Sequence, residues 1–137
     1  MTKAPTSAQN SVLIVEDDKF LQKILLTKFQ KEGFDARGAM DGEEAIKELL
    51  TFKPTVILLD LILPKLTGFE VMTELRTNPK TTGIPVVILS NLSQEEDRRR
   101  ALDLGALDFL VKADISINSV VQRVKEALAK NMAKPTG

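Results

Sequence analysis

Short apolar runs alternate along the chain with longer stretches in which apolar residues recur every three or four positions. Four runs cover residues 12–15, 56–59, 85–89 and 109–111, and residues 34–38 form a fifth, more polar candidate. Continuous rather than alternating apolarity is typical of strands that are covered on both faces. The pattern therefore predicts a parallel sheet of five strands.

Helical periodicity fills the intervals between these runs. The chain carries three long apolar stripes, which contain Phe20, Leu21, Ile24, Leu25 and Phe29, then Ala45, Ile46, Leu49 and Leu50, and finally Ile117, Val120, Val121, Val124 and Leu128. Two shorter segments complete a set of five helices. Each stripe predicts a helix face that packs on the sheet.

Residues that start or stop helices support these intervals. Three pairs have the spacing of a capping box, namely Thr67 with Glu70, Ser93 with Glu96 and, more loosely, Asp41 with Glu44. Gly33 and Gly105 stand where helices are expected to stop. The result is five βα units, which predict right-handed crossovers and an open sheet with helices on both faces.

The chain has 137 residues, which is about the size of one domain. We expect a disordered tail over residues 1–10, one domain over residues 11–130, and a short flexible tail over residues 131–137. The polar start resembles no signal peptide, and no apolar run approaches the roughly 20 residues that span a bilayer. These features predict a cytoplasmic protein with no membrane partner.

Composition narrows the chemistry that this domain can perform. The 19 basic and 19 acidic residues give zero formal net charge, which provides no general attraction to nucleic acid. The chain has no histidine and no cysteine, so the commonest neutral base, the commonest metal ligand and thiolate chemistry are all missing. Any reactive site must use carboxylates, hydroxyls and lysine.

Polar residues with reactive side chains follow four of the five predicted strands. Glu16 and Asp17 follow the first strand, Asp60 the third, Ser90 ends the fourth, and Lys112 follows the fifth. In open α/β sheets the reactive crevice lies at the carboxyl ends of the strands. We therefore expect these side chains to meet, and carboxylates that lie this close together require a cation.

Each of these residues also has a structural interpretation. Asp17 or Asp18 can cap the first helix, and Asp60 can simply terminate a strand. Ser90 can be a turn residue, and Lys112 can extend its ammonium group into solvent. Capping, however, does not explain why acids, a hydroxyl and an amine fall at the ends of different strands.

Four stretches, VLIVEDD, VILLDLILPKLTG, VVILSN and DFLVK, resemble in this order the receiver domain of two-component response regulators. The resemblance covers residues 11–128 and includes Pro64 and Gly68, four and eight residues after Asp60. It implies a flavodoxin-like (βα)5 three-layer sandwich whose five parallel strands are ordered 2-1-3-4-5. It also implies a stand-alone receiver that is a switch and not an enzyme.

The resemblance assigns a role to each residue of the acidic site. Asp60 is the expected acceptor of a phosphoryl group from a sensor histidine kinase or a histidine phosphotransfer protein. Glu16, Asp17, Asp60 and the backbone carbonyl of Ile62 are the expected Mg²⁺ ligands, with Asp18 in the first helical turn. Lys112 is expected to offset charge on the phosphoryl group.

The resemblance also predicts how the signal leaves the site. Ser90 matches the hydroxyl that switches position, and Phe109 matches the aromatic residue that changes rotamer with it, although Phe109 can equally be a core residue. The output surface is expected on the fourth helix, fifth strand and fifth helix, where an unknown downstream protein binds. A monomer or a weak dimer is expected.

The chain departs from the family pattern at several positions near the site. Ala113 stands where the family usually has a proline with a cis bond, so the Lys112–Ala113 bond can be cis or trans. Asn91 replaces a small residue after the hydroxyl. In the family, the residues two past the phosphoacceptor and two past the hydroxyl flank the path of the hydrolytic water. By the resemblance these are Ile62 and Leu92, which cannot hydrogen-bond to a water, and this predicts a long-lived phosphorylated form.

Three other functions are alternatives to a receiver. A haloacid dehalogenase-type phosphatase needs a second aspartate two residues after Asp60, where this chain has Ile62. A nucleotide-binding module needs a glycine-rich phosphate loop, and neither GxGxxG nor GxxxxGK[ST] occurs. A receiver-like interaction domain that is never phosphorylated stays open as the alternative.

Overall fold

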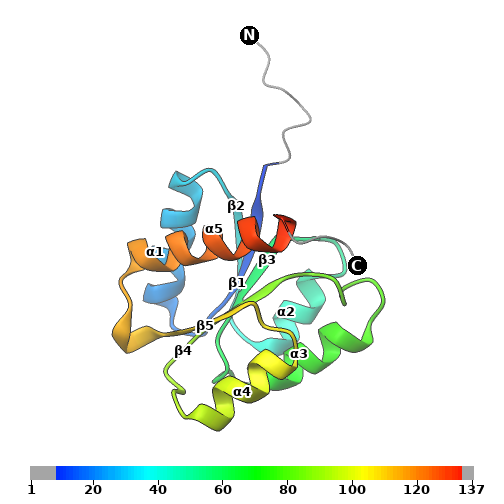
Figure 1. Ribbon diagram of the computed structural model, residues 1–137. Coiled ribbons are helices and arrows are strands. Elements are labelled where there is room, and N and C mark those ends of the chain that lie inside the picture. Colours follow the sequence, from blue (N-terminus) through cyan, green and yellow to red (C-terminus); the bar gives the residue numbers. More distant parts are fainter. Residues whose placement is uncertain (1–8, 134–137) are drawn as a thin grey trace.

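A parallel sheet of five strands forms the centre of the molecule (Figure 1). The computed structural model describes residues 9–133. The strands are β1 (Ser11–Val15), β2 (Asp35–Ala39), β3 (Val56–Leu59), β4 (Val86–Ser90) and β5 (Asp108–Val111). Their order in the sheet is β2-β1-β3-β4-β5, which confirms the flavodoxin-like order that the resemblance implied.

Helices cover both faces of this sheet (Figure 1). They are α1 (Lys19–Lys31), α2 (Gly42–Glu48), α3 (Gly68–Thr77), α4 (Glu95–Asp103) and α5 (Ile117–Ala133), with a short 3-10 turn η1 (Lys112–Asp114) after β5. Helices α1 and α5 lie on one face, and α2, α3 and α4 lie on the other (Figure 1). The expected tails over residues 1–10 and 131–137 fall mostly outside the described residues, so their boundaries stay predictions.

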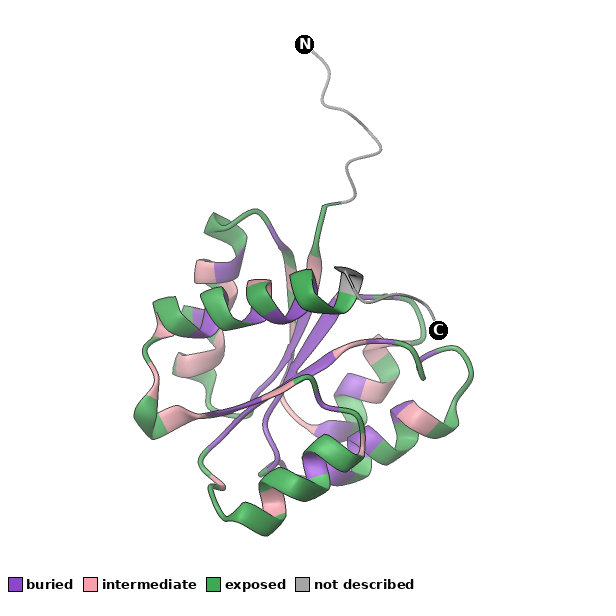
Figure 2. Ribbon diagram, viewed as in Figure 1, coloured by how far each residue is buried: buried purple, intermediate pink, exposed green. Residues whose placement is uncertain are grey.

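Two apolar cores, one on each face of the sheet, hold these layers together. Successive strand residues alternate between them, as Leu13 and Ile14 do in β1. Strands β1, β3, β4 and β5 are accordingly the most continuously buried part of the molecule (Figure 2), whereas β2, at the edge of the sheet, is exposed at Asp35 and Arg37. This double burial explains why those four strands appear in the sequence as apolar runs.

The helix ends agree with the sequence at most positions. The side chains and backbone groups of Thr67 and Glu70 form the complete predicted capping box. Gly33 and Gly105 end helices with φ angles of +93° and +97°, which only glycine adopts without strain. The box predicted at Ser93 is wrong, because α4 begins one residue later than that spacing requires and its N-cap is Gln94, which makes no side-chain capping bond.

Three residues of the predicted stripes point to solvent. Phe20 and Ile24 of α1 are 83% and 51% exposed, and Leu50 is 77% exposed. The inward face of α1 is fixed by Leu25 and Phe29, which are fully buried one turn apart. Leu50 lies beyond the end of α2, so no helical turn directs it toward the sheet.

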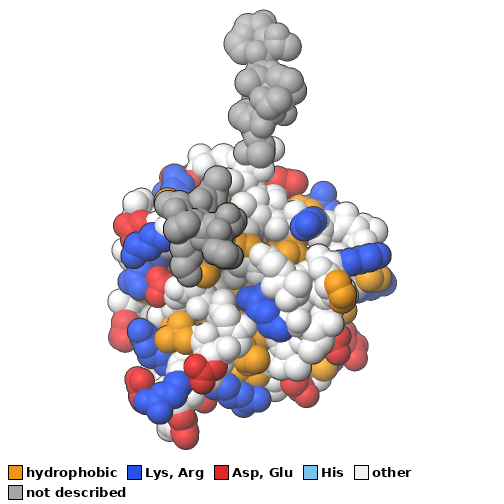
Figure 3. All heavy atoms as spheres, turned by 45° about the vertical axis from the view of Figure 1, so that its right-hand side comes forward, with side chains coloured by type: hydrophobic (Ala, Val, Ile, Leu, Met, Phe, Trp, Pro, Cys, Tyr) orange, Lys and Arg blue, Asp and Glu red, His pale blue; other side chains and the backbone are white. Residues whose placement is uncertain are grey.

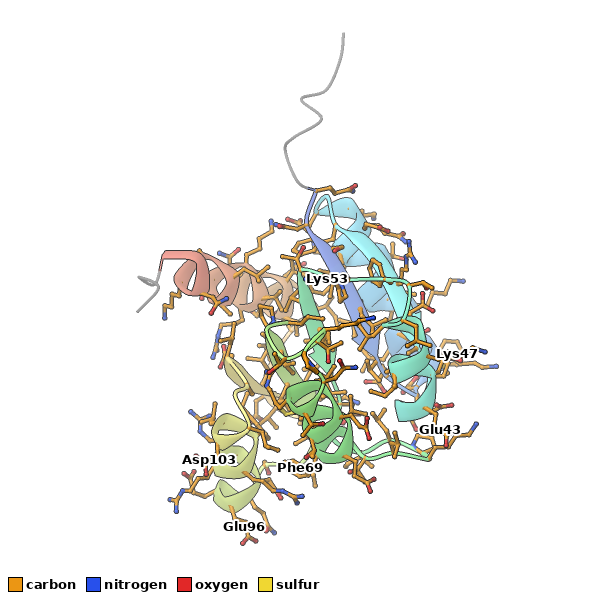
Figure 4. The ribbon with its side chains drawn as sticks, turned by 90° about the vertical axis from the view of Figure 1, so that its right-hand side faces the viewer. Glu43, Lys47, Lys53, Phe69, Glu96 and Asp103 are labelled. Atoms are coloured by element: carbon orange, nitrogen blue, oxygen red, sulfur yellow. The ribbon has the colours of Figure 1, made fainter. Side chains whose placement is uncertain are left out.

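The surface of α2, α3 and α4 is mixed in charge. Figure 4 shows Glu43 and Lys47 on α2 and Glu96 and Asp103 on α4, and Figure 3 shows acidic and basic side chains interspersed over the face it presents. Phe69, at the start of α3, lies under the guanidinium group of an arginine of α4. Within residues 9–133, no helix combines the length and apolarity needed to cross a membrane.

Candidate functional site

The reactive side chains predicted from the sequence meet at the carboxyl edge of the sheet. Carboxylate oxygens of Glu16, Asp17 and Asp60 all lie within 4.8 Å of one another. The Lys112 ammonium group enters the same cluster from the end of β5. Parallel pairing of β1 with β3 produces this meeting, because it aligns Val15 with Leu59 and so places the residues that follow them side by side.

Asp60 is held rigidly at the end of β3. It is only 4% exposed, and its N–H donates to the carbonyl of Val15 at 3.1 Å. Its Oδ1 accepts the N–H of Ile62 at 3.0 Å, while Oδ2 accepts from Lys112 at 2.6 Å. Both carboxylate oxygens are therefore partnered, which compensates the loss of hydration that burial imposes.

A glycine permits the chain after Asp60 to fold back tightly. A Cβ atom at Gly68 would lie 2.3 Å from the carbonyl oxygen of Asp60 and 2.6 Å from the Cα of Leu61. Both distances are far below van der Waals contact with backbone atoms that cannot easily move. Gly68 therefore lets the first turn of α3 pack directly against the loop of residues 60–67, in which Lys65 adopts a positive φ of 70°.

Lys112 is the one basic residue that contacts this acidic cluster in the described part of the chain. Its Nζ lies 2.6 Å from Asp60 Oδ2 and 2.7 Å from Glu16 Oε1, and its side chain is 18% exposed. The two carboxylate side chains are 5% or less exposed. The snorkelling interpretation of Lys112 is therefore wrong, because the ammonium group points inward to two buried acids.

Burial and pairing shift the pKa values in this cluster. Burial raises the pKa of Glu16 above its ordinary value, although the hydrogen bonds from Lys112 and from the N–H of Asp18 oppose this effect. Burial alone would lower the pKa of Lys112, but the hydrogen bonds and charges of Asp60 and Glu16 outweigh it, and the pKa is raised. Lys112 therefore stays charged at neutral pH. Its contact with Glu16 offsets only part of the effect of burial on the charged form of that carboxylate.

The ligand set suits a hard divalent cation. Three carboxylates with converging oxygens, one of them exposed on Asp17, offer the oxygen ligands that Mg²⁺ binds. Asp18 does not join this set, because its side chain caps α1 by accepting the N–H groups of Phe20 and Leu21. The backbone of Ile62 lies beside Asp60 through its N–H, and its carbonyl as a metal ligand stays a prediction.

Ser90 and Phe109 take positions consistent with either of their interpretations. Ser90 is fully buried at the end of β4, and its Oγ accepts the N–H of Leu92 at 3.4 Å. Within residues 9–133 its hydroxyl makes no hydrogen bond to Asp60 or Lys112. Phe109 is 6% exposed and packs in the core that α4 covers.

Two features of the site were not predicted from the sequence. The Gln22 amide donates to the carbonyls of Glu16 and Ala39 at 3.2 and 2.9 Å, and so ties the ends of β1 and β2 to α1. The signal for it was a polar residue directly after Leu21 of the apolar stripe. The pairing of Lys112 with Glu16 carries no local signal, since the two residues are 96 positions apart.

Comparisons with known proteins agree with this geometry. The family model described as "Response regulator receiver domain" matches residues 12–125. The chain is 37% identical over 120 residues to the alkaline phosphatase synthesis transcriptional regulatory protein PhoP of Bacillus subtilis, covering 88% of this chain and 49% of that protein. It is 33% identical over 119 residues to the DNA-binding dual master transcriptional regulator RpaA of Synechocystis, covering 87% of this chain and 49% of that protein.

A solved structure supports the same assignment. The receiver domain of the Francisella response regulator 1452 superimposes with a TM-score of 0.80 at 33% identity, covering 89% of this chain and 98% of that one. The chain spans about half the length of the two transcriptional regulators. Because the family model covers most of the chain and the strand order agrees, the chain belongs to the receiver domain family of response regulators.

Proposed function

We propose that this chain is a phosphorylation-dependent switch in which Asp60 accepts a phosphoryl group from a sensor histidine kinase or a histidine phosphotransfer protein. The observation that carries the proposal is the position of Asp60. It is 4% exposed, paired with Lys112 at 2.6 Å, and within 4.8 Å of the carboxylates of Glu16 and Asp17. A carboxylate buried among other acids destabilises the fold, and such clusters are found mainly at functional sites.

The transfer follows from this arrangement. A carboxylate oxygen of Asp60 attacks phosphorus in line, forming a P–O bond while the P–N bond to the donor imidazole breaks. The electron pair of the P–N bond stays on the imidazole nitrogen, which then takes up a proton. The Lys112 ammonium group then contacts a phosphoryl oxygen in place of the Asp60 carboxylate, so the charge of Lys112 stays compensated.

The carboxylates of Glu16, Asp17 and Asp60 would hold Mg²⁺, which when bound would supply positive charge that offsets the negative charge of the phosphoryl group. The protein's own residues orient these ligands. The N–H of Asp18 donates to Glu16 Oε2 at 3.0 Å and fixes that carboxylate. The Gln22 amide fixes the backbone of the same loop through the Glu16 carbonyl.

Apolar side chains beside the site favour docking of a protein donor. Phe20 and Ile24 lie one turn apart on α1 and are 83% and 51% exposed, and Ile62, two residues after Asp60, is 54% exposed. Helix α1 begins three residues after Glu16, so Phe20 in its first turn follows the carboxyl end of β1, as Ile62 follows the end of β3. An exposed apolar surface next to a reactive group is suited to a macromolecular partner.

The output is proposed on the face formed by α4, β5 and α5. Phosphorylation gives the Ser90 hydroxyl a new hydrogen-bond acceptor, which draws Ser90 inward. This movement alters the space beside Phe109, because Phe109 of β5 pairs with Ile88 of β4, two residues before Ser90. A hollow of about 420 Å³ lies between β5 and α5 and includes Phe109, Asp114, Ser119 and Arg123 in its lining. A downstream protein is proposed to bind on this face.

Intact mass after incubation with acetyl phosphate and Mg²⁺ tests the proposal. The wild type should gain the mass of one phosphoryl group, and Asp60→Asn should gain none while keeping its far-UV circular dichroism. Asp35→Asn, which removes an exposed acid at the other end of the sheet, is the matched control and should be modified like the wild type. A wild type that gains no phosphoryl mass from acetyl phosphate or from a phosphorylated histidine donor would instead indicate the unphosphorylated interaction domain.

A further inference from the structure

The loop after β4 is joined to the loop after β5 by a side chain. Asn91 Oδ1 accepts the N–H of Ala113 at 3.2 Å. Strand pairing sets up this contact, because Ser90 lies beside Val111 and the chain continues from each strand in the same direction. This pairing brings the two loops close enough for the Asn91 carboxamide to reach the backbone of Ala113.

The two joined residues are direct neighbours of two site residues. Asn91 follows Ser90, whose hydroxyl is buried, and Ala113 follows Lys112, whose ammonium group lies 2.6 Å from Asp60. A shift of the loop after β5 therefore moves the ammonium group that contacts Asp60, and a shift of the loop after β4 moves the Ser90 hydroxyl. The hydrogen bond makes such a shift in one loop act on the other.

The bond depends on an unusual pair of residues. Proline at position 113 would provide no N–H, and a small residue at position 91 would provide no acceptor. The described residues contain no cis peptide bond, so Lys112 and Ala113 are joined in trans. In this chain the Asn91 carboxamide restrains the backbone after Lys112 through the Ala113 N–H.

We propose that Asn91 is a positioning residue that couples the Ser90 loop to the Lys112 loop through the Ala113 N–H. The inference rests on the proposed phosphorylation of Asp60. With the bond in place, the hydroxyl and the ammonium group are aligned together for the phosphoryl group. Without it, the two loops sample positions independently, and fewer molecules present both groups at once.

The expected effect is on phosphorylation and not on metal binding. One neutral hydrogen bond corresponds to a change of about two- to tenfold in a rate or population. The predicted metal ligands Glu16, Asp17 and Asp60 follow β1 and β3, so their affinity for Mg²⁺ should be unchanged. This division separates positioning from a general loss of structure, which would weaken both.

A double-mutant cycle tests the coupling. Asn91→Leu keeps the size of the side chain but removes the acceptor, and Ala113→Pro removes the donor. Each should lower the phosphorylation rate by acetyl phosphate at saturating Mg²⁺ by about two- to tenfold. The double variant should be no slower than the slower single variant, because the same bond is lost in all three.

Ala113→Gly is the matched control, since it keeps the N–H. In that background Asn91→Leu should produce the same loss as in the wild type. Hydrogen exchange of the Ala113 amide, followed by NMR without any phosphodonor, should be faster in Asn91→Leu than in the wild type. Isothermal titration should give the same Mg²⁺ affinity for every variant.

The outcomes separate this inference from the proposed function. Additive losses in the cycle, an unchanged rate in Asn91→Leu, or an equally protected Ala113 amide would each overturn the role of Asn91 while Asp60 phosphorylation stands. A parallel fall in Mg²⁺ affinity and rate would assign Asn91 a structural role only. Failure of the wild type itself to become phosphorylated would overturn both proposals.

Discussion

Replacing Lys112 with methionine tests whether its ammonium group stabilises the acidic cluster. Methionine keeps most of the apolar stem and removes the charge. Glu16 and Asp60 are 2% and 4% exposed, so both would remain buried without their nearest cation. Breaking a buried pair by removing one partner costs about 3–5 kcal/mol. Because the lysine side chain is itself 18% exposed, we expect the lower end, about 3 kcal/mol in the absence of Mg²⁺.

The same change should strengthen Mg²⁺ binding. In the wild type the ion must compete with Lys112 for the oxygens of Glu16 and Asp60, which the ammonium group contacts at 2.7 and 2.6 Å. Removing that competitor leaves the carboxylates to the metal, and an affinity gain of about tenfold corresponds to about 1.4 kcal/mol. Saturating Mg²⁺ should therefore recover part of the lost stability.

The pH dependence of the free energy of unfolding provides an independent test of the role of Lys112. The pKa of Glu16 is raised in the folded protein, so ionisation of Glu16 destabilises the fold. This destabilisation is absent at pH values below about 4.5, the ordinary pKa of the group, and it grows as the pH rises from there through the pKa of the folded protein. Without Lys112 the pKa of Glu16 should rise further. The deficit of Lys112→Met should therefore shrink as the pH falls from neutral toward 4.5. The stabilisation from Lys112, whose pKa is raised, is present below about 10.5 and is lost at higher pH through the folded value.

Urea unfolding followed by circular dichroism, with EDTA or with Mg²⁺, measures the stability, and isothermal titration measures the affinity. Lys125→Met is the matched control, because Lys125 pairs with Glu32 on the exposed surface, where solvent screening leaves such pairs little effect on stability. If Lys112→Met is no less stable than Lys125→Met in EDTA, or binds Mg²⁺ no more tightly than the wild type, the ammonium group does not hold the cluster together.

Three further changes test the architecture around the site. Gly68→Ala should cost about 1–3 kcal/mol in urea unfolding, because the new Cβ would lie 2.3 Å from the Asp60 carbonyl, whereas Gly83→Ala meets nothing within 4 Å and should be close to neutral. Arg76→Lys should destabilise by about 2 kcal/mol, since lysine cannot reproduce the hydrogen bonds to the carbonyls of Leu104, Thr82 and Ile84; an unchanged urea midpoint would contradict this. Ile62→Asn with Leu92→Glu should speed the decay of phosphorylated protein after donor removal, because both changes add groups that can orient a water; equal decay would refute the apolar barrier.

The fold was predictable because its determinants are local in sequence. Four of the five strands contain an unbroken apolar run, and the helices between the strands carry apolar stripes that pack in the two cores. The exceptions have a physical cause. Phe20 fits the periodicity of α1, yet it is 83% exposed because it lies in the first turn, while Leu25 and Phe29 supply the contact with the sheet.

The composition of the site was predictable, but its contacts were not. Parallel strands place their following residues at one edge, so Glu16, Asp60 and Lys112 were expected at the same edge of the sheet. The pairing of one ammonium group with both acids depends on distances of 2.6 and 2.7 Å, which backbone topology alone does not fix. The contact of Asn91 with Ala113 is of the same kind, because it joins residues 22 positions apart through one side chain.

The charges at the site suggest why phosphorylation would act as a switch. One lysine faces three carboxylates, so two negative charges remain for a divalent cation to compensate. Converting the Asp60 carboxylate into an acyl phosphate adds negative charge and moves it outward from the end of β3. The Ser90 hydroxyl accepts the Leu92 N–H at 3.4 Å, which leaves its own proton for a new acceptor. If Asp60 is phosphorylated as proposed, the added charge would favour movement of the Ser90 loop toward Asp60, and the bond from Asn91 to Ala113 would carry that movement to the Lys112 loop after β5.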